Sequence, residues 1–348
     1  MKPLRTALLL ALLLVPAGCG GRLRSGSGDS TTTSTSTVVD ATTPTTANST
    51  TPSLDTTAPD TIAPDTTMPA PTAPPTAGPA EGSWDGSLVT TDGRTRTYHV
   101  YAPGDLDPAG APLLMALHGG TGTGSQFEAR SGFDDLAELY GFVVVYPDGI
   151  GSGATETDNR TWNAGICCGQ AALKGVDDVA FIGRLIDVME QTYTIDQKSV
   201  FAAGHSNGGF MAYRLACELS DRIVAVGVQA GGLGVSPCTP SQPVSLLHIH
   251  GTADTNVPIA GGKGSGISQV AFPPLDQSLA AVTAAMGCAG QPDESKDGIV
   301  TTKSWDSCAA DTTVELQLID GAPHAWIRGD DFDSADAIVE FLMTHARG

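Results

Sequence analysis

Short segments of almost unbroken apolar residues recur along the chain and alternate with segments of helical periodicity. An apolar segment of strand length with no polar face is typical of a strand covered on both sides. We predict strands, most of this kind, at 95–103, 112–120, 141–149, 199–206, 223–232, 244–254 and 313–326. We predict helices at 177–193, 207–218, 276–288 and 334–346. Strands alternating with helices favour right-handed crossovers, so the expected fold class is α/β, with a mostly parallel central sheet and helices on both faces.

The N-terminus has the features of an export signal. Lys2 and Arg5 precede an apolar run at 7–15 that is too short to span a bilayer comfortably. Residues 15–19, Val-Pro-Ala-Gly-Cys, resemble a bacterial lipobox and predict a lipid anchor on Cys19. Pro16 stands where an aliphatic residue is usual, so ordinary cleavage nearby and a fully secreted product is the alternative. Residues 1–19 are therefore the predicted signal, and we expect an extracellular or cell-envelope protein.

The composition changes abruptly after the signal. Residues 20–82 consist mostly of Thr, Ser, Pro and Ala, with too few large apolar side chains to offset the entropy of ordering. We predict a disordered stalk that tethers the rest of the chain; a merely tolerated spacer is the alternative. Residues 83–348 are the predicted catalytic domain.

The charge excludes some classes of partner. The formal net charge is −20 at pH 7, from 38 Asp+Glu against 18 Lys+Arg. Nucleic acids select basic faces, so we expect no nucleic acid partner. The charge gives no electrostatic attraction to an anionic membrane, which leaves the lipid on Cys19 as the expected membrane attachment.

Six cysteines follow Cys19: Cys167, Cys168, Cys217, Cys238, Cys288 and Cys308. An even number in an exported protein indicates disulfides, although sequence alone leaves all pairings open. Cys288 and Cys308 are the favoured pair, and we expect the adjacent Cys167 and Cys168 each to have a distant partner because joining them would be strained. The spacing lacks the paired C-x2-C of a zinc site, and we expect no metal.

The motif Gly204-His205-Ser206-Asn207-Gly208 lies between a predicted strand and a predicted helix. A G-x-S-x-G pattern is weak by itself in a glycine-rich chain, and a plain turn is the alternative. The strand–turn–helix context is that of a nucleophile elbow, in which glycines clear space around a serine in an unfavourable backbone conformation. The sequence therefore predicts Ser206 as a nucleophile.

A serine nucleophile needs a histidine base and a carboxylate that orients it. In α/β-hydrolases these follow in the order Ser, Asp or Glu, His, after successive strands. Asp254 and His324 meet this order and are the predicted partners of Ser206. Other carboxylates in or beside late loops are Asp276, Asp330, Asp331 and Asp333. We expect His205, His248 and His250 to pack or hydrogen-bond instead of acting as the base.

The tetrahedral intermediate of acyl transfer needs two N–H donors for its oxyanion. One predicted donor is the backbone of Asn207, directly after the serine. The other is Gly120 or Thr121 in the glycine-rich loop 117–124, where His118 is expected to brace the loop. The two candidates in this loop cannot be separated from sequence.

Six segments occur in an order that resembles the secreted polyhydroxybutyrate-depolymerase-like esterases, which include feruloyl and acetylxylan esterases. They are LHGGTGTG, WNAGICCG, VDDVAFI, GHSNGGFMAYRLACELSDRIVAV, HGTADTNVP and GAPHAW. The resemblance covers nearly all of the predicted domain and implies an α/β-hydrolase fold with a Ser206–Asp254–His324 triad. The loop around His324 departs from the family, in which the histidine is commonly followed by x-Trp-Pro.

The expected function is therefore that of an exported carboxylic ester hydrolase, acting through an acyl-enzyme with no metal or organic cofactor. Its expected substrate is a polyester, a feruloylated or acetylated polysaccharide, or a small ester. Trp162 and Trp326 flank the predicted site loops, and either stack on an aromatic or sugar group or pack in the core. A peptidase on the same fold and a non-catalytic, wall-tethered binding module are the alternatives.

Overall fold

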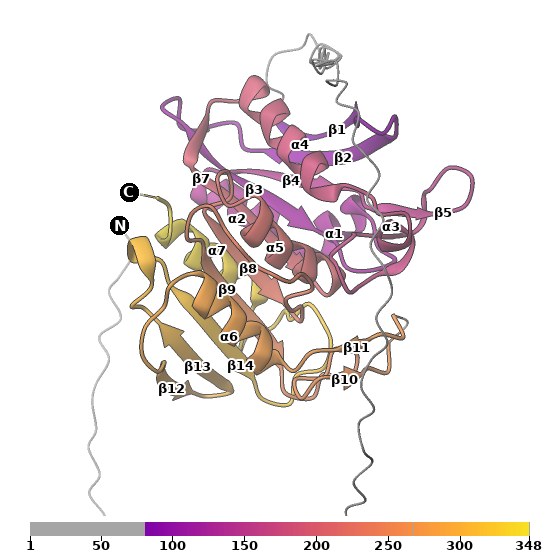
Figure 1. Cartoon of the computed structure of the whole chain (residues 1–348). Helices are drawn as coiled ribbons and strands as arrows, with labels where there is room; N and C mark the ends of the chain where they lie inside the picture. The colour runs from indigo at the N-terminus through magenta and orange to yellow at the C-terminus, as the bar shows by residue number, and fades with distance from the viewer. Residues whose placement is uncertain (1–80, 267, 348) are drawn as a thin grey trace, which may run out of the picture. The chain divides into compact units, whose positions relative to one another are not determined.

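A ten-stranded sheet runs through the part of the chain that the computed structural model describes, residues 81–266 and 268–347 (Figure 1). Its spatial order is β1 (Gly82–Val89), β2 (Thr95–Ala102), β4 (Val143–Pro147), β3 (Ala111–Leu117), β7 (Ile195–His205), β8 (Ala225–Gln229), β9 (Ser245–Gly251), β14 (Val314–Ile319), β13 (Val300–Trp305) and β12 (Asp293–Asp297). The predicted signal with Cys19, and residues 20–80 of the predicted stalk, lie outside the described residues.

The centre of this sheet is parallel and its edges are antiparallel. All neighbouring pairs from β4 to β14 run parallel, and β1, β2, β12 and β13 each pair antiparallel. The central strands are buried along their length, as in β4, β8 and β9. The prediction of an α/β fold with a mostly parallel sheet is confirmed.

Helices cover both faces of the sheet. They are α1 (Gly124–Ser131), α2 (Phe133–Tyr140), α3 (Gly169–Leu173), α4 (Asp178–Thr192), α5 (Asn207–Glu218), α6 (Leu275–Ala285) and α7 (Ser334–Thr344), with a 3-10 turn at Ala309–Asp311. Helices α4, α5 and α6 share one apolar cluster with the sheet and lie in front of it in Figure 1, whereas α1, α2 and α7 share another. Asp177 caps α4 by accepting a hydrogen bond from the Ala180 amide. Every helix among the described residues is too short or too polar to cross a membrane.

Several elements have no counterpart in the sequence prediction. Strand β12 is exposed at every residue, and β1 alternates between exposed and half-buried positions, so neither has a continuous apolar run. Helices α1 and α2 have eight residues each, which is short for a clear helical period. Two small sheets, β5 (Ile150–Ser152) with β6 (Asp158–Thr161) and β10 (Gly262–Lys263) with β11 (Ala271–Phe272), lie in loops.

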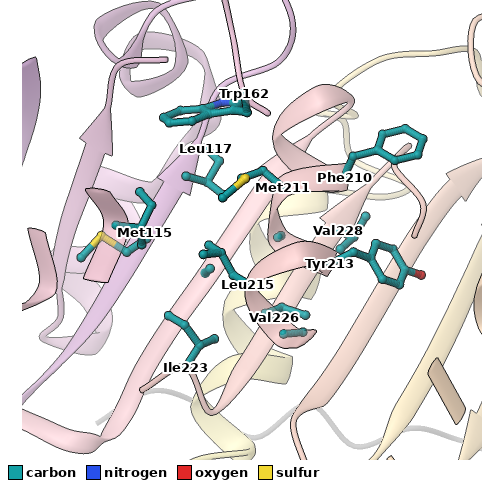
Figure 2. Close-up of a cluster of buried hydrophobic side chains, with 14 of the residues drawn as sticks. Met115, Leu117, Trp162, Phe210, Met211, Tyr213, Leu215, Ile223, Val226 and Val228 are labelled. Carbon is teal, nitrogen blue, oxygen red and sulfur yellow. The ribbon is translucent and has the colours of Figure 1, made fainter. Parts of the chain in front are cut away.

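The helix that follows Ser206 is anchored by the larger apolar cluster. Figure 2 shows Met115 and Leu117 of β3 beside Met211 and Leu215 of α5, all four fully buried. Each such side chain contributes about 1.5–3 kcal/mol on burial. This packing fixes the start of α5 relative to the end of β3, which brings the predicted oxyanion loop to the predicted nucleophile.

Three disulfides lie within the described residues. Cys288 pairs with Cys308, as predicted, and Cys217 pairs with Cys238. The expectation that Cys167 and Cys168 have distant partners is wrong: they are joined to each other. The other four cysteines of the domain are already paired, so these two adjacent thiols have only one another.

The Cys217–Cys238 disulfide ties the last turn of α5 to the loop after β8, across a sequence separation of 21 residues. Loop-closure entropy gives about 3 kcal/mol for a loop of this size. We expect the double variant Cys217→Ser/Cys238→Ser to lose about this much free energy of unfolding, measured by urea denaturation without reductant. An unchanged unfolding midpoint would contradict the expectation.

Candidate active site

Ser206 lies in the turn between β7 and α5 with a backbone φ of 55° and ψ of −118°. A positive φ is costly for a residue with a side chain and persists only where the surroundings enforce it. A Cβ on Gly204 would overlap the backbone of Gly208, and a Cβ on Gly208 would overlap the carbonyls of Leu117 and His118. The two glycines of the motif are therefore required by the close approach of β7, α5 and the end of β3.

Three side chains that are far apart in the sequence meet at this turn. His324 Nε2 lies 2.9 Å from the Ser206 hydroxyl oxygen, and His324 Nδ1 lies 2.7 Å from Asp254 Oδ2. His324 comes from the loop after β14, and Asp254 from the loop after β9. Both strands are parallel to β7, so their carboxyl ends open on the same edge of the sheet. This arrangement can pass a proton from the hydroxyl to an imidazole held by a carboxylate.

Asp254 is held by donors on both of its oxygens. Oδ1 accepts hydrogen bonds from the amides of Asn256 at 2.8 Å and Val257 at 2.9 Å. Oδ2 faces His324 and also His250, whose Nε2 is 3.2 Å away. Burial alone would raise the pKa of Asp254, but the bonds from His250, His324 and Val257 outweigh it and hold the pKa below its ordinary value. The carboxylate therefore stays ionised although its side chain is fully buried.

The predicted oxyanion donors lie together, but they are not equally free. Gly120 and Asn207 are neighbours, since a Cβ built on Gly120 would be 3.7 Å from the Asn207 Cβ. Among the described residues, neither backbone amide donates to another protein atom. The Thr121 amide instead donates to the Arg160 carbonyl at 2.7 Å. The structure thus leaves Gly120 and Asn207 as the amides available to a ligand.

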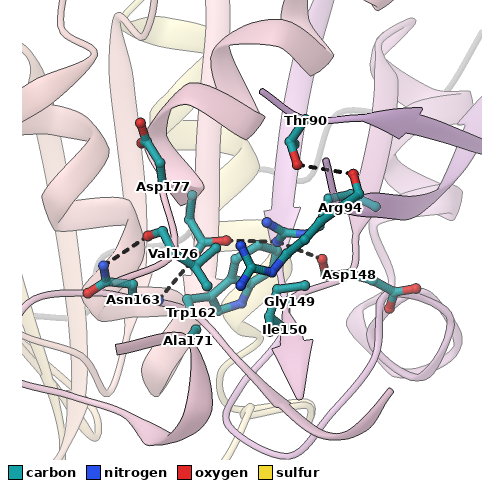
Figure 3. A network of polar contacts seen from close by, with 12 residues as sticks. Thr90, Arg94, Asp148, Gly149, Ile150, Trp162, Asn163, Ala171, Val176 and Asp177 are labelled. Atoms are coloured by element: carbon teal, nitrogen blue, oxygen red, sulfur yellow. Dashed lines mark hydrogen bonds and ion pairs between the residues drawn. The ribbon is translucent and has the colours of Figure 1, made fainter. Parts of the chain in front are cut away.

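The side chain of Asn207 fastens the start of α5 to a distant loop. It accepts a bond from the Trp162 amide at 2.7 Å and donates to the Trp162 carbonyl at 3.1 Å. The next residue, Asn163, donates its amide to Asp178, which pairs with Arg96 at 2.7 Å in the protein interior. Arg96 also donates to the Asp148 carbonyl, and Asn163 to the Val176 carbonyl, within the network of Figure 3. This network positions the Asn207 amide.

Neither predicted tryptophan belongs to the residues that line the site. Trp162 is fully buried, donates its indole N–H to the His118 carbonyl and lies over Leu117 in Figure 2. Trp326 packs edge-on against Phe127 and Phe133 and donates to the Ser131 carbonyl. Both indoles are placed as packing residues, because their apolar faces are covered by neighbouring side chains.

The neighbouring histidines are neutral. His118 donates to the Gly119 carbonyl and accepts from the Gly149 amide, which braces the loop as expected. Burial lowers the pKa of His118 to about 4. Burial and the adjacent His324 lower the pKa of His205 to about 3, and neither ring nitrogen of His205 has a partner among the described residues. Among the described residues, His324 is the histidine whose ring contacts the Ser206 hydroxyl.

The other late carboxylates are used elsewhere or stand apart. Asp333 caps α7 and pairs with Arg328, and Asp276 lies in the first turn of α6. Within the described residues, Asp254 is the carboxylate that His324 contacts.

The side chains of Ser206 and His324 line an open cleft of about 790 Å³. Much of its wall carries hydroxyl and amide groups, from Ser152, Asn159, Gln170, Asn256, Ser265 and Ser268. Phe210, Phe272 and the Cys167–Cys168 pair add apolar surface. Most of these residues could not be predicted from the sequence, because they come from loops and short elements that have no periodic pattern.

The depressed pKa of Asp254 makes stability depend on pH. A carboxyl whose folded-state pKa lies below its unfolded value of about 4 stabilises the fold above that pH and loses this contribution as the pH falls. We expect the wild-type protein to have a higher free energy of unfolding than Asp254→Asn. This difference should be largest at pH 6 and should shrink below about pH 4. Urea denaturation of both proteins across this range measures it; a pH-independent difference would contradict the assignment.

Known proteins are similar to this chain in sequence. Residues 96–245 match the family model described as Esterase PHB depolymerase. The bifunctional acetylxylan esterase/xylanase XynS20E of Neocallimastix patriciarum is 33% identical over 162 residues, which are 47% of this chain and 22% of that protein. Feruloyl esterase B of Piromyces equi is 29% identical over 240 residues, covering 67% of this chain and 42% of the relative. The chain thus spans less than half the length of either relative.

The fold is also shared with a solved structure. The acetyl xylan esterase from Aspergillus awamori has a TM-score of 0.52 at 17% identity, and the match covers 75% of this chain and 99% of that one. At this identity the likeness concerns the fold alone. The family match and the fold agree: residues 96–245 are similar to the Esterase PHB depolymerase family, and the described part of the chain has an α/β-hydrolase fold.

Proposed function

We propose that the protein hydrolyses carboxylic esters with Ser206 as nucleophile, His324 as general base and acid, and Asp254 as the group that orients His324. The Ser206 oxygen attacks the ester carbonyl while His324 Nε2 takes its proton. His324 then gives this proton to the departing alcohol, leaving an acyl-enzyme. Water, deprotonated by His324, attacks the acyl-enzyme and releases the acid and free Ser206.

The observation that carries this proposal is the pair of contacts at His324, 2.9 Å to the Ser206 hydroxyl and 2.7 Å to Asp254. Because Asp254 accepts at Nδ1, His324 carries its proton there and has Nε2 free to accept from the serine. The contact with Asp254 also stabilises the imidazolium that forms during each transfer.

The oxyanion donors in this proposal are the amides of Gly120 and Asn207. Both lack an intramolecular acceptor among the described residues and border the cleft beside Ser206. The Asn207 amide is also at the N-terminus of α5, where the helix dipole favours negative charge. Thr121 is not proposed, since its amide is already bonded to Arg160.

For the substrate class we propose an acetylated or feruloylated polysaccharide. The hydroxyl and amide groups of the cleft suit sugar hydroxyls, and the cleft is open enough for a chain to pass. A solid polyester is bound through exposed apolar surface, but the large exposed apolar side chains of the described residues, such as Leu139, Leu173 and Ile299, lie outside the cleft lining. XynS20E is named as an acetylxylan esterase and the relative from Piromyces equi as a feruloyl esterase.

We further propose that the protein works outside the cell, which the three disulfides support because such bonds persist in oxidising compartments. A lipid on Cys19 and a tethering role for residues 20–82 stay predictions.

Ser206→Ala tests the nucleophile. We expect it to lower kcat on p-nitrophenyl acetate and butyrate by at least about 10⁴-fold and to abolish labelling by a fluorophosphonate, because no other group supplies the attacking oxygen. Ser295→Ala, at an exposed position of β12, is the matched control and keeps full activity. Wild type without turnover or labelling would overturn the enzyme proposal and favour a binding module.

A parallel comparison of substrates tests the proposed class. We expect release of acetate from acetylated xylan or of ferulate from feruloylated arabinoxylan, with lower activity on a film of poly-3-hydroxybutyrate. Faster erosion of the film than of either polysaccharide ester would contradict the polysaccharide proposal. Cleavage of a peptide p-nitroanilide series at rates comparable to the esters would favour the peptidase alternative.

A further inference from the structure

A row of buried polar side chains continues inward from Asp254. His250 Nε2 lies 3.2 Å from Asp254 Oδ2, and His250 Nδ1 lies 2.9 Å from His248 Nε2. His248 Nδ1 in turn lies 2.8 Å from the Tyr213 hydroxyl. The two histidines are two positions apart on β9 and so share one face of the sheet, and their rings are nearly parallel, at an interplanar angle of 2°. Tyr213 reaches them from α5, with its hydroxyl directed away from the apolar cluster in Figure 2.

With one proton on each imidazole, the hydrogen bonds of this row run in one direction. His250 Nε2 is also 2.9 Å from the Val257 carbonyl, which accepts and never donates, so this nitrogen carries the proton. With its one proton on Nε2, His250 accepts at Nδ1, which requires the proton of His248 on Nε2. His248 therefore accepts at Nδ1 from the Tyr213 hydroxyl. Every donor in the row then has an acceptor, and the one Nε2–H of His250 is shared between the Val257 carbonyl at 2.9 Å and Asp254 Oδ2 at 3.2 Å.

The row is cut off from solvent. The side chains of Tyr213 and His248 are fully buried, and those of His250 and Asp254 are 1% and 0% exposed. Burial raises the pKa of Tyr213 and lowers that of His248, which keeps the phenol protonated and the imidazole neutral. Buried polar groups that are all satisfied hold a single arrangement more rigidly than apolar packing does.

We propose that His250 is a positioning residue for the hydrolysis, and that His248 and Tyr213 set the tautomer that lets it donate to Asp254. This inference rests on the proposed function, since Asp254 matters here through His324. Oδ2 of Asp254 faces two imidazole donors and Oδ1 accepts two backbone amides, so the carboxylate cannot rotate. It then stays in place when His324 gains and loses a proton, and little reorganisation is needed during catalysis.

Two substitutions at His250 distinguish the role of its N–H as a hydrogen-bond donor from the role of its side chain in packing. His250→Leu fills the space but removes the donor, so Asp254 loses one of its two imidazole partners. We expect kcat to fall about 10- to 100-fold with little change in KM, because substrate does not touch His250. His250→Gln can present an amide N–H near the position of Nε2, and we expect it to recover kcat to within about fivefold of wild type.

A matched control accounts for damage to the strand. Leu247 is adjacent to His248 and fully buried on the opposite face of β9. Leu247→Ala is expected to lower the unfolding temperature at least as much as His250→Leu, while kcat stays within about twofold of wild type. A loss of kcat that simply follows the loss of stability across these variants would overturn the positioning role.

An NMR measurement determines the tautomers of His248 and His250 without requiring ester hydrolysis. In ¹⁵N-labelled wild-type protein, two-bond ¹H–¹⁵N correlations assign the protonated ring nitrogen of each histidine. We expect the ring proton of both His248 and His250 on Nε2, and Tyr213→Phe to change the His248 signals most. The opposite tautomer at His250, or wild-type kcat in a folded His250→Leu, would overturn the proposal. If the wild-type protein hydrolyses no ester, the proposed function is overturned. The NMR assignment of the protonated ring nitrogens still tests the proposed hydrogen bonds among Tyr213, His248 and His250.

Discussion

The site depends on how closely α5 approaches the end of β3. Gly208 can lie against the carbonyls of Leu117 and His118 only because it has no side chain, and this contact brings the loop of Gly120 to the amide of Asn207. The same turn forces Ser206 into a positive φ, which the sheet and helix on either side hold in place. The position of Ser206 and the approach of Gly120 to Asn207 are thus consequences of one steric constraint.

Buried polar contacts then hold the loops that this constraint brings together. On one side, the Arg96–Asp178 pair supports Asn163, and Trp162 clamps the side chain of Asn207. On the other, Asp254 receives donors from its own loop and from His250. Breaking a buried ion pair is expensive because it leaves one charge unpaired, so these contacts favour a single arrangement of the loops. The open polar cleft lies between these two supports.

The elements with strong local patterns could be predicted from the sequence. The apolar runs of β3, β4, β8 and β9 and the period of α4 follow from burial, and the order of Ser206, Asp254 and His324 matches the loops in which these residues lie. The exposed strand β12 has no such pattern, because an edge strand is stabilised by backbone pairing and needs no apolar side chains. The pairing of Cys167 with Cys168 was mispredicted, since sequence cannot say which thiols lie within reach.

The sequence by itself determined the α/β class, the strand–turn–helix around Ser206 and the identity of its candidate partners, because periodicity and turn chemistry are local properties. Only the tertiary structure showed that the Thr121 amide is bonded to Arg160, placed Trp162 and Trp326 outside the cleft lining, and connected Tyr213, His248 and His250 to Asp254. Each of these depends on which hydrogen-bond acceptor or apolar surface a folded neighbour presents. That information arises only when segments far apart in the chain are packed together.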